Sequence, residues 1–220
     1  MSLQDTVTKQ YVSDPKVFAD AFNYLIYNGE QVIRPEQLTD LDATQFAIPY
    51  REEDEGKPEA TQKYRDVLKT LAVKTDERCT YLVLGIENQS NVHYAMPVRN
   101  MLYDAMQYEK QVRQLAAAHR RKHDAATSDE YLSGMNREDK ITPVITLVIN
   151  FGSKRWDGPL SLYEMMPEQP AKVKAFVQDY KVFLIDPMAM TDTDLEHLNS
   201  SLREVLSYIK SVSYTHLRAH

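Results

Sequence analysis

Apolar side chains recur at helical spacing in three parts of the chain, which predicts helices over residues 13–29, 97–121 and 195–209. The first of these, "SDPKVFADAFNYLIYNG", has both ends marked. Ser13 or Asp14 can cap it, and Asn28-Gly29 supplies a C-terminal stop. The second is the longest, and its apolar stripe comprises Val98, Met101, Ala105, Tyr108, Val112 and Leu115.

Shorter apolar or alternating runs predict strands over residues 43–50, 62–73, 80–89, 141–152 and 180–187. The run "TYLVLGIENQ" (80–89) is almost continuously apolar until its end, which is typical of a strand buried on both faces. The run "QKYRDVLKTLAV" (62–73) fits a strand or a helix equally well. Residues 51–60 and 124–140 are typical of loops. The order of the elements predicts an α/β sandwich around a mixed sheet.

The strand over residues 80–89 ends in Glu87, Asn88 and Gln89 without a turn residue. Side chains alternate along a strand, so Glu87 and Gln89 are expected to share one face. Ligands of open α/β sheets tend to bind at the carboxyl ends of strands. The position therefore suits a site, although these side chains could also do no more than solvate a strand end.

A hard cation such as Mg²⁺ needs a second acid at this position, because it usually binds one or two carboxylates together with water and phosphate oxygens. Asp66 is the candidate, since a hairpin of the strands over 62–73 and 80–89 would bring it beside Glu87. The simpler interpretation is that Asp66 pairs with Arg65 or Lys69 at the surface. The spacing alone favours this simpler interpretation.

Composition limits the class of protein. The chain has 220 residues, a length that suits one domain with a full core. Its single cysteine excludes an internal disulfide framework and suits a reducing, cytoplasmic location. We expect no signal peptide and no membrane contact, because no apolar run approaches the length of a bilayer span. The net charge of −6 means that a polyanion would need a local basic patch or bridging cations.

Three segments together resemble a known bacterial family. They are "KYRDVLK", "YLVLGIENQSNVHYAMPVRNMLYDAMQYEKQV" and "KITPVITLVINFGSKRWDGPLSLYEMM". They are similar to the recombination-promoting nucleases, or Rpn family, also called PD-(D/E)XK nuclease family transposases. The likeness runs from about Asp14 to Lys210. It implies a restriction-endonuclease-like (PD-(D/E)XK) core, a mixed sheet flanked by helices, and metal-dependent cleavage of DNA.

The resemblance also implies a site. It identifies Asp66, Glu87 and Gln89 as catalytic, and Asp66 and Glu87 as ligands of Mg²⁺ or Mn²⁺. An acid on the first helix often completes such sites, and Asp20 is better placed for this than Glu30.

Two departures from the family pattern concern the motif. The usual proline-aspartate is Arg65-Asp66 here, and the usual lysine is Gln89. An amide can align water but carries no positive charge. The chemistry would then depend more on the metal or on a nearby cation, for which Arg99 is the first candidate. Arg99 is also the candidate for DNA binding, although it could equally be a surface arginine.

The expected partner is DNA, and a homodimer stays open. The alternative function is a catalytically inactive DNA-binding or protein-interaction module of the same fold. The basic run "HRRKH" (119–123) either contacts the DNA backbone or complements the helix dipole, and the second interpretation is the simpler one. His93 has no zinc-site spacing, so a structural or substrate-positioning role fits it better.

The last nine residues, "VSYTHLRAH" (212–220), resemble the translation of a transposon-type sequencing adapter. The expected organisation is therefore a single PD-(D/E)XK nuclease-like domain over residues 1–211, truncated at its C-terminus, followed by a non-native tail over 212–220. Such a tail is expected to make few contacts with the core.

Overall fold

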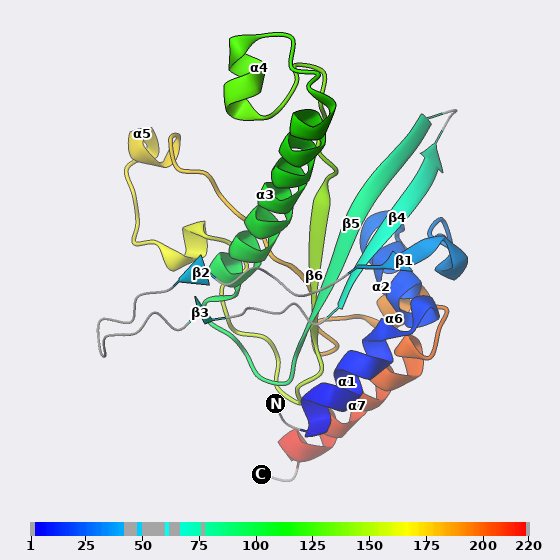
Figure 1. Ribbon diagram of the computed structural model, residues 1–220. Helices are drawn as coiled ribbons and strands as arrows, with labels where there is room; N and C mark the ends of the chain where they lie inside the picture. Colours follow the sequence, from blue (N-terminus) through cyan, green and yellow to red (C-terminus); the bar gives the residue numbers. More distant parts are fainter. Residues whose placement is uncertain (1–2, 42–47, 50–59, 62–66, 76–77, 219–220) are drawn as a thin grey trace.

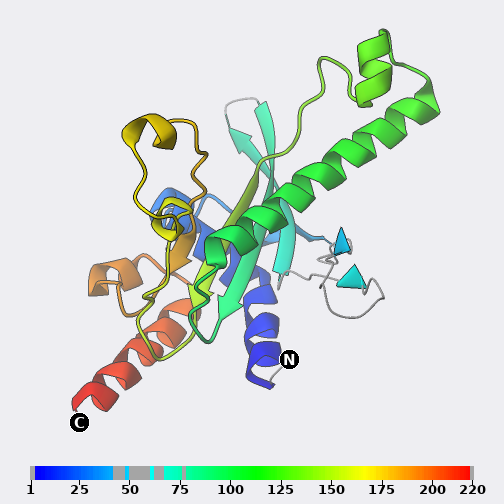
Figure 2. The same cartoon turned by 90° about the vertical axis from the view of Figure 1, so that its left-hand side faces the viewer.

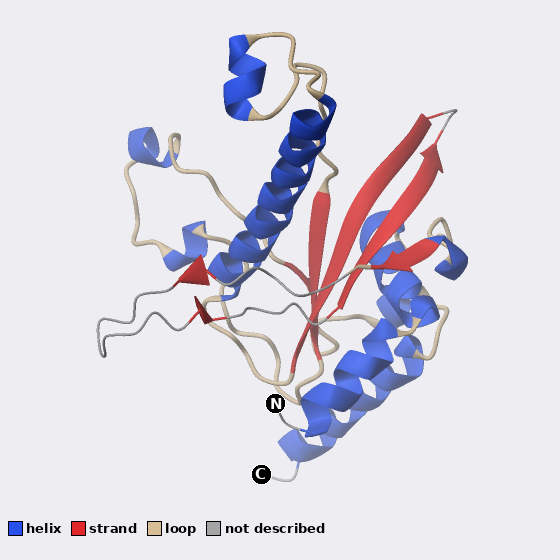
Figure 3. Ribbon diagram, viewed as in Figure 1, coloured by secondary structure: helices blue, strands red, loops and turns tan. Residues whose placement is uncertain are grey.

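A computed structural model of the chain describes residues 3–41, 48–49, 60–61, 67–75 and 78–218. Five strands form the main sheet in the order β1-β4-β5-β6-β7: β1 (Leu38–Asp40), β4 (Val67–Thr75), β5 (Arg78–Gln89), β6 (Val144–Asn150) and β7 (Phe183–Ile185). The pairs β1–β4 and β4–β5 are antiparallel, whereas β5–β6 and β6–β7 are parallel. A separate pair joins β2 (Ile48–Pro49) to β3 (Ala60–Thr61). The predicted mixed α/β fold is confirmed (Figure 3).

The helices are α1 (Leu3–Ser13), α2 (Pro15–Tyr27), α3 (Met96–Lys122), α4 (Ser128–Ser133), α5 (Ala171–Lys174), α6 (Asp192–Glu196) and α7 (Leu202–Arg218), with the 3-10 turns η1 (Pro35–Gln37) and η2 (Tyr163–Met165). In Figure 1, α3 covers one face of the sheet, and α1, α2 and α7 lie against the other. Among the described helices, none is long and apolar enough to cross a membrane.

The main core lies between the sheet and the α1/α2/α7 layer. Phe18 and Phe22 of α2 are fully buried there with Ile86, Leu147 and Ile149 of the sheet. The alternate residue Val148 points into a smaller cluster with Met96, the first residue of α3. Successive side chains of β6 therefore pack alternately against the helices on the two faces of the sheet, as expected because side chains alternate along a strand.

The first predicted helix is confirmed together with its ends. Asp14 caps α2 by accepting hydrogen bonds from the backbone N–H groups of Lys16 (2.8 Å) and Val17 (3.4 Å). Asn28 ends the helix in the left-handed region with φ 52°. An asparagine side chain tolerates this backbone conformation better than most residues do.

The ambiguous segment over residues 62–73 is a strand where it is described. β4 pairs with β5 in a hairpin, with Val67 opposite Ile86. β5 then pairs in parallel with β6, with Glu87 opposite Val148 and Gln89 opposite Asn150. Parallel neighbours need a crossover connection, and α3 lies within it.

The predicted apolar stripe of α3 is wrong in its first turns. Val98 and Met101 are 42% and 38% exposed, so they do not face the core. The buried stripe instead includes the polar residues Asn100, Asp104 and Gln107 together with Met96 and Tyr103. Hydropathy selects apolar positions, so it identified the wrong face of a helix that buries three polar side chains.

Further differences concern elements that were not predicted, among them α1, β1 and α4. α1 and β1 have weak patterns, and α4 lies within the segment 124–140 that was expected to be a loop. α4 has a capping box in which Thr127 and Glu130 bond each other's backbone N–H groups, a signal that is present in the sequence.

The expectation that residues 212–220 make few contacts is wrong at Ser213. α7 continues through Arg218, and Ser213 is buried within it. The Ser213 hydroxyl donates a hydrogen bond to the backbone oxygen of Ser153 at 2.6 Å. The non-native origin of the tail stays a prediction.

Candidate functional site

The candidate site lies at a corner of the fold, where β5 ends, a short turn follows and α3 begins. The half-buried Gln89 ends β5, and its backbone oxygen accepts a hydrogen bond from Phe151 at 2.8 Å. This bond extends the β5–β6 pairing to the last residue of β5. The carboxyl ends of two parallel strands therefore meet here, as expected for a site in an open α/β sheet.

Of the two predicted carboxylate ligands, the structure describes the backbone position of Glu87, on β5. Glu87 lies at the register position of Val148 on β6. Asp66 lies outside the described residues. Val67, the next residue in the chain, pairs with Ile86, which immediately precedes Glu87. Lys69, a proposed surface partner of Asp66, is buried and forms an ion pair with Asp40 of β1.

Asp20 is engaged elsewhere. It is buried on α2, and its carboxylate accepts hydrogen bonds from the backbone N–H of Asn199 (3.0 Å) and of Ser200 (2.8 Å) and from the Ser200 hydroxyl (2.6 Å). These partners immediately precede α7. The geometry thus gives Asp20 a structural role that holds α2 to the start of α7, and its role as a cation ligand stays a prediction. Glu30 is exposed in the segment that follows α2.

Arg99 lies in the first turns of α3, beside the corner. Its Nε donates a hydrogen bond to the hydroxyl of Tyr103 at 3.2 Å, and its guanidinium carbon lies 5.5 Å from the centre of the Tyr103 ring. Tyr103 thus orients the half-buried guanidinium through a hydrogen bond and a cation–π contact. Phosphate binding by Arg99 stays a prediction.

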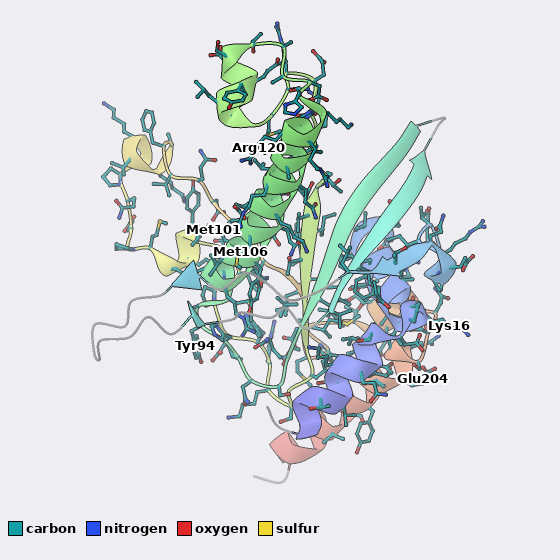
Figure 4. The ribbon with its side chains drawn as sticks, viewed as in Figure 1. Lys16, Tyr94, Met101, Met106, Arg120 and Glu204 are labelled. Atoms are coloured by element: carbon teal, nitrogen blue, oxygen red, sulfur yellow. The ribbon has the colours of Figure 1, made fainter. Side chains whose placement is uncertain are left out.

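His93 lies in the turn between β5 and α3. Burial, followed by the nearby positive charge of Arg99, lowers the pKa of His93 below its ordinary value. Both effects favour the neutral imidazole. Its buried Nδ1 atom has no hydrogen-bond partner. The next residue, Tyr94, is exposed at the base of α3 and donates a hydrogen bond to Asp157 at 3.0 Å (Figure 4).

Sequence reasoning missed Asn100. This residue is 0% exposed on the side of α3 that faces the sheet, and neither its Nδ2 nor its Oδ1 atom has a hydrogen-bond partner. One turn later, Asp104 accepts hydrogen bonds from Thr146 of β6 and from the hydroxyl of Tyr180 (2.6 Å). An asparagine in a helix gives no sign in the sequence that its amide will be buried, so no pattern could have singled it out.

The basic run over residues 119–123 lies far from this corner. α3 has 27 residues, so its two ends are about 40 Å apart at 1.5 Å per residue. Tyr94 and Arg120 mark the two ends in Figure 4. Figure 2 shows the far end of α3 and α4 projecting away from the sheet. Within the described residues, no group of three or more His, Cys, Asp or Glu side chains is arranged to hold a metal ion.

Comparison with known proteins identifies the family. A family profile described as "Putative transposase, YhgA-like" matches residues 58–218. The match includes the β4–β5 hairpin, the corner and α3. No curated protein and no solved structure matches the chain. The profile spans well over half of the sequence, and the chain therefore belongs to the YhgA-like transposase family.

Proposed function

We propose that this protein is a divalent-cation-dependent DNA endonuclease with a PD-(D/E)XK core, in which Asp66 and Glu87 hold Mg²⁺ or Mn²⁺. The observation that supports it most is the register of the β4–β5 hairpin. Val67 pairs with Ile86, so Asp66 and Glu87 are the chain neighbours of a paired couple at the end of the hairpin. Two acids at such positions are an oxygen-donor set that a hard cation prefers.

The corner also suits the proposed cation. Asn100 and the Nδ1 atom of His93 are buried without a partner, so polar groups are available near the strand end. A bound cation would polarise a phosphodiester and stabilise the charge that develops on it. Gln89, at the end of β5, would orient the attacking water. Arg99, held by Tyr103, would bind the phosphate backbone and supply positive charge that Gln89 lacks.

Membership of a transposase family is consistent with this activity, because the movement of DNA segments requires phosphodiester cleavage. The second candidate is a DNA-binding or protein-interaction module of the same fold without activity. The two candidate functions differ in whether Asp66 and Glu87 are needed for DNA cleavage. One assay distinguishes between them.

The assay is cleavage of a supercoiled plasmid by the purified full chain. With Mg²⁺ or Mn²⁺ the plasmid should be nicked or linearised, and EDTA should stop the reaction. Asp66→Asn and Glu87→Gln should each reduce cleavage to the background without protein, because each removes a carboxylate from the cation site. Gln89→Ala should retain residual activity. Asp129→Asn, on the surface of α4, is the matched control and should cleave like the unmodified protein.

Cleavage that persists in the double variant Asp66→Asn/Glu87→Gln would show that another site or a contaminating nuclease is responsible. Plasmid binding without cleavage under both cations would support the inactive binding module instead.

A further inference from the structure

The buried amide of Asn100 is placed at the level of Glu87 on β5. Met96, one turn before it on α3, packs against Val148 of β6. Asp104, one turn after it, accepts a hydrogen bond from Thr146. Asn100 therefore lies over the segment between Thr146 and Val148. On β5 the register partners of these two residues are Gly85 and Glu87.

The amide of Asn100 is expected to have a hydrogen-bond partner, because buried side-chain polar atoms are nearly always hydrogen-bonded. The neighbouring polar residue of the same stripe follows this rule, since Asp104 bonds both Thr146 and Tyr180. Two other buried asparagines do so as well. Asn23 exchanges hydrogen bonds with the backbone of Ile33, and Asn150 bonds Gly152, Lys154 and Asp186. Asn100 differs from both, because its donor and its acceptor are both unpaired.

We propose that Asn100 is a positioning residue of the cation site. When the cation is bound, its Nδ2 donates a hydrogen bond to the carboxylate of Glu87, and its Oδ1 accepts one from a water molecule at the site. Asn100 does not contact the cation itself. This inference rests on the proposed function, because Glu87 is one of the two proposed cation ligands.

The chemistry of the amide fits this position. Carboxylates that bind a metal are in turn hydrogen-bonded, and this fixes their orientation. A neutral donor can fix the orientation of a carboxylate without competing with the cation. A lysine would compete, because its positive charge also pairs with the carboxylate. A site that has lost the usual lysine in favour of Gln89 would gain orientation from Asn100 without gaining charge.

The test is the affinity of the full chain for Mn²⁺, measured by isothermal titration calorimetry in the absence of DNA. Asn100→Leu should weaken Mn²⁺ binding by about ten- to a hundredfold, which is the usual effect of removing such a hydrogen-bonding partner. Its Tm without cation should be unchanged or higher, because leucine fills a similar volume and leaves no unpaired amide. Gln107→Leu, on the same buried stripe of α3 and two turns farther from the corner, is the matched control and should keep the unmodified affinity.

A second variant covers the outcome in which Asn100→Leu does not fold. Asn100→Ala adds no bulk, and it must show at least a tenfold loss of Mn²⁺ affinity. In the background of Glu87→Gln, substitution of Asn100 should cause no further loss, since the amide acts through a carboxylate of the site.

The outcomes separate this inference from the proposed function. If Glu87→Gln loses Mn²⁺ binding while Asn100→Leu and Asn100→Ala bind within twofold of the unmodified protein, the role of Asn100 is overturned and the proposed cation site stands. If the unmodified protein binds no Mn²⁺, or binds it independently of Asp66 and Glu87, the proposed function fails and the role of Asn100 fails with it.

Discussion

Asp20 is a buried carboxylate whose partners lie near the other end of the chain. Both of its oxygen atoms accept hydrogen bonds from residues 199–200. Asp20→Asn should lower the free energy of unfolding by about 1–3 kcal/mol, because an amide offers one acceptor oxygen and leaves buried donors unpaired. Urea unfolding measures this change.

The control for the Asp20→Asn experiment is the substitution of an exposed aspartate. Asp192, whose side chain is 94% exposed, pairs with Lys210, and Asp192→Asn should cost no more than about 1 kcal/mol. If Asp20→Asn leaves the free energy of unfolding unchanged and removes Mn²⁺ binding, Asp20 is a cation ligand, as the family resemblance implies.

Individual residues show where prediction from the sequence stops. Glu87 and Gln89 were placed at a strand end because alternation and an apolar run are local properties. Asp20 is also a candidate from the sequence, but an acid that holds a distant segment of the chain and an acid that binds a cation have the same local sequence. The unpaired amide of Asn100 is a property of packing between α3 and β6, so it appears only in three dimensions.

At the level of elements, the strands and the ends of helices were more predictable than the buried faces. Asp14 and Asn28 cap the two ends of α2. Capping depends on the cap residue and its near neighbours in the chain, so the bounds of α2 could be deduced from the sequence. The pattern of residues 62–73 fits both a strand and a helix. Its described part is a strand because it pairs with β5. The buried face of α3 could not be deduced, because Asn100, Asp104 and Gln107 lie on it among apolar residues, and hydropathy does not select polar positions.

The junction of α3 and α4 should respond to pH. The imidazole of His119 bonds Asp124 at 2.7 Å and Asp139 at 2.8 Å. These bonds, first to Asp124 and then to Asp139, raise the pKa of His119 above its ordinary value of 6.5. The folded state thus binds the proton more tightly, so the stabilisation is complete below pH 6.5 and is lost as the pH rises through the raised pKa.

Thermal unfolding of the unmodified protein and of His119→Gln between pH 6 and pH 9 tests this prediction. The Tm difference between the two proteins should be largest near pH 6 and should shrink at higher pH. Asp139→Asn removes one of the two negative charges that favour the protonated imidazole, so it should reduce the pH dependence. A Tm difference that stays constant over this range would show that His119 contributes by packing alone.

For the whole molecule, the family match begins at residue 58, yet the core needs the helices before it. Phe18 and Phe22 of α2 are fully buried against the sheet. Loss of a buried phenylalanine typically costs about 3–5 kcal/mol, and a domain has only about 5–15 kcal/mol in total. A chain that lacks residues 1–34 should therefore show no cooperative melt and should bind a hydrophobic dye.

The matched control for this deletion is a chain that ends after Ser211. It loses the bond between Ser213 and Ser153 and the last turns of α7, but it keeps the core residues Leu202 and Leu206. It should still melt cooperatively. A cooperative melt of the chain without residues 1–34 would show that the family-matched region folds without α1 and α2.

The bond between Asp20 and Asn199 has a consequence for synthesis, because its partners are separated by 179 residues. Ribosomes add about 5–20 residues per second, so roughly 9–36 s pass between the two ends of this contact. During that time the apolar face of α2 lacks its final cover from α7. The core around Phe18 and Phe22 therefore cannot close before the start of α7 has been synthesised, since Leu202 and Leu206 belong to it.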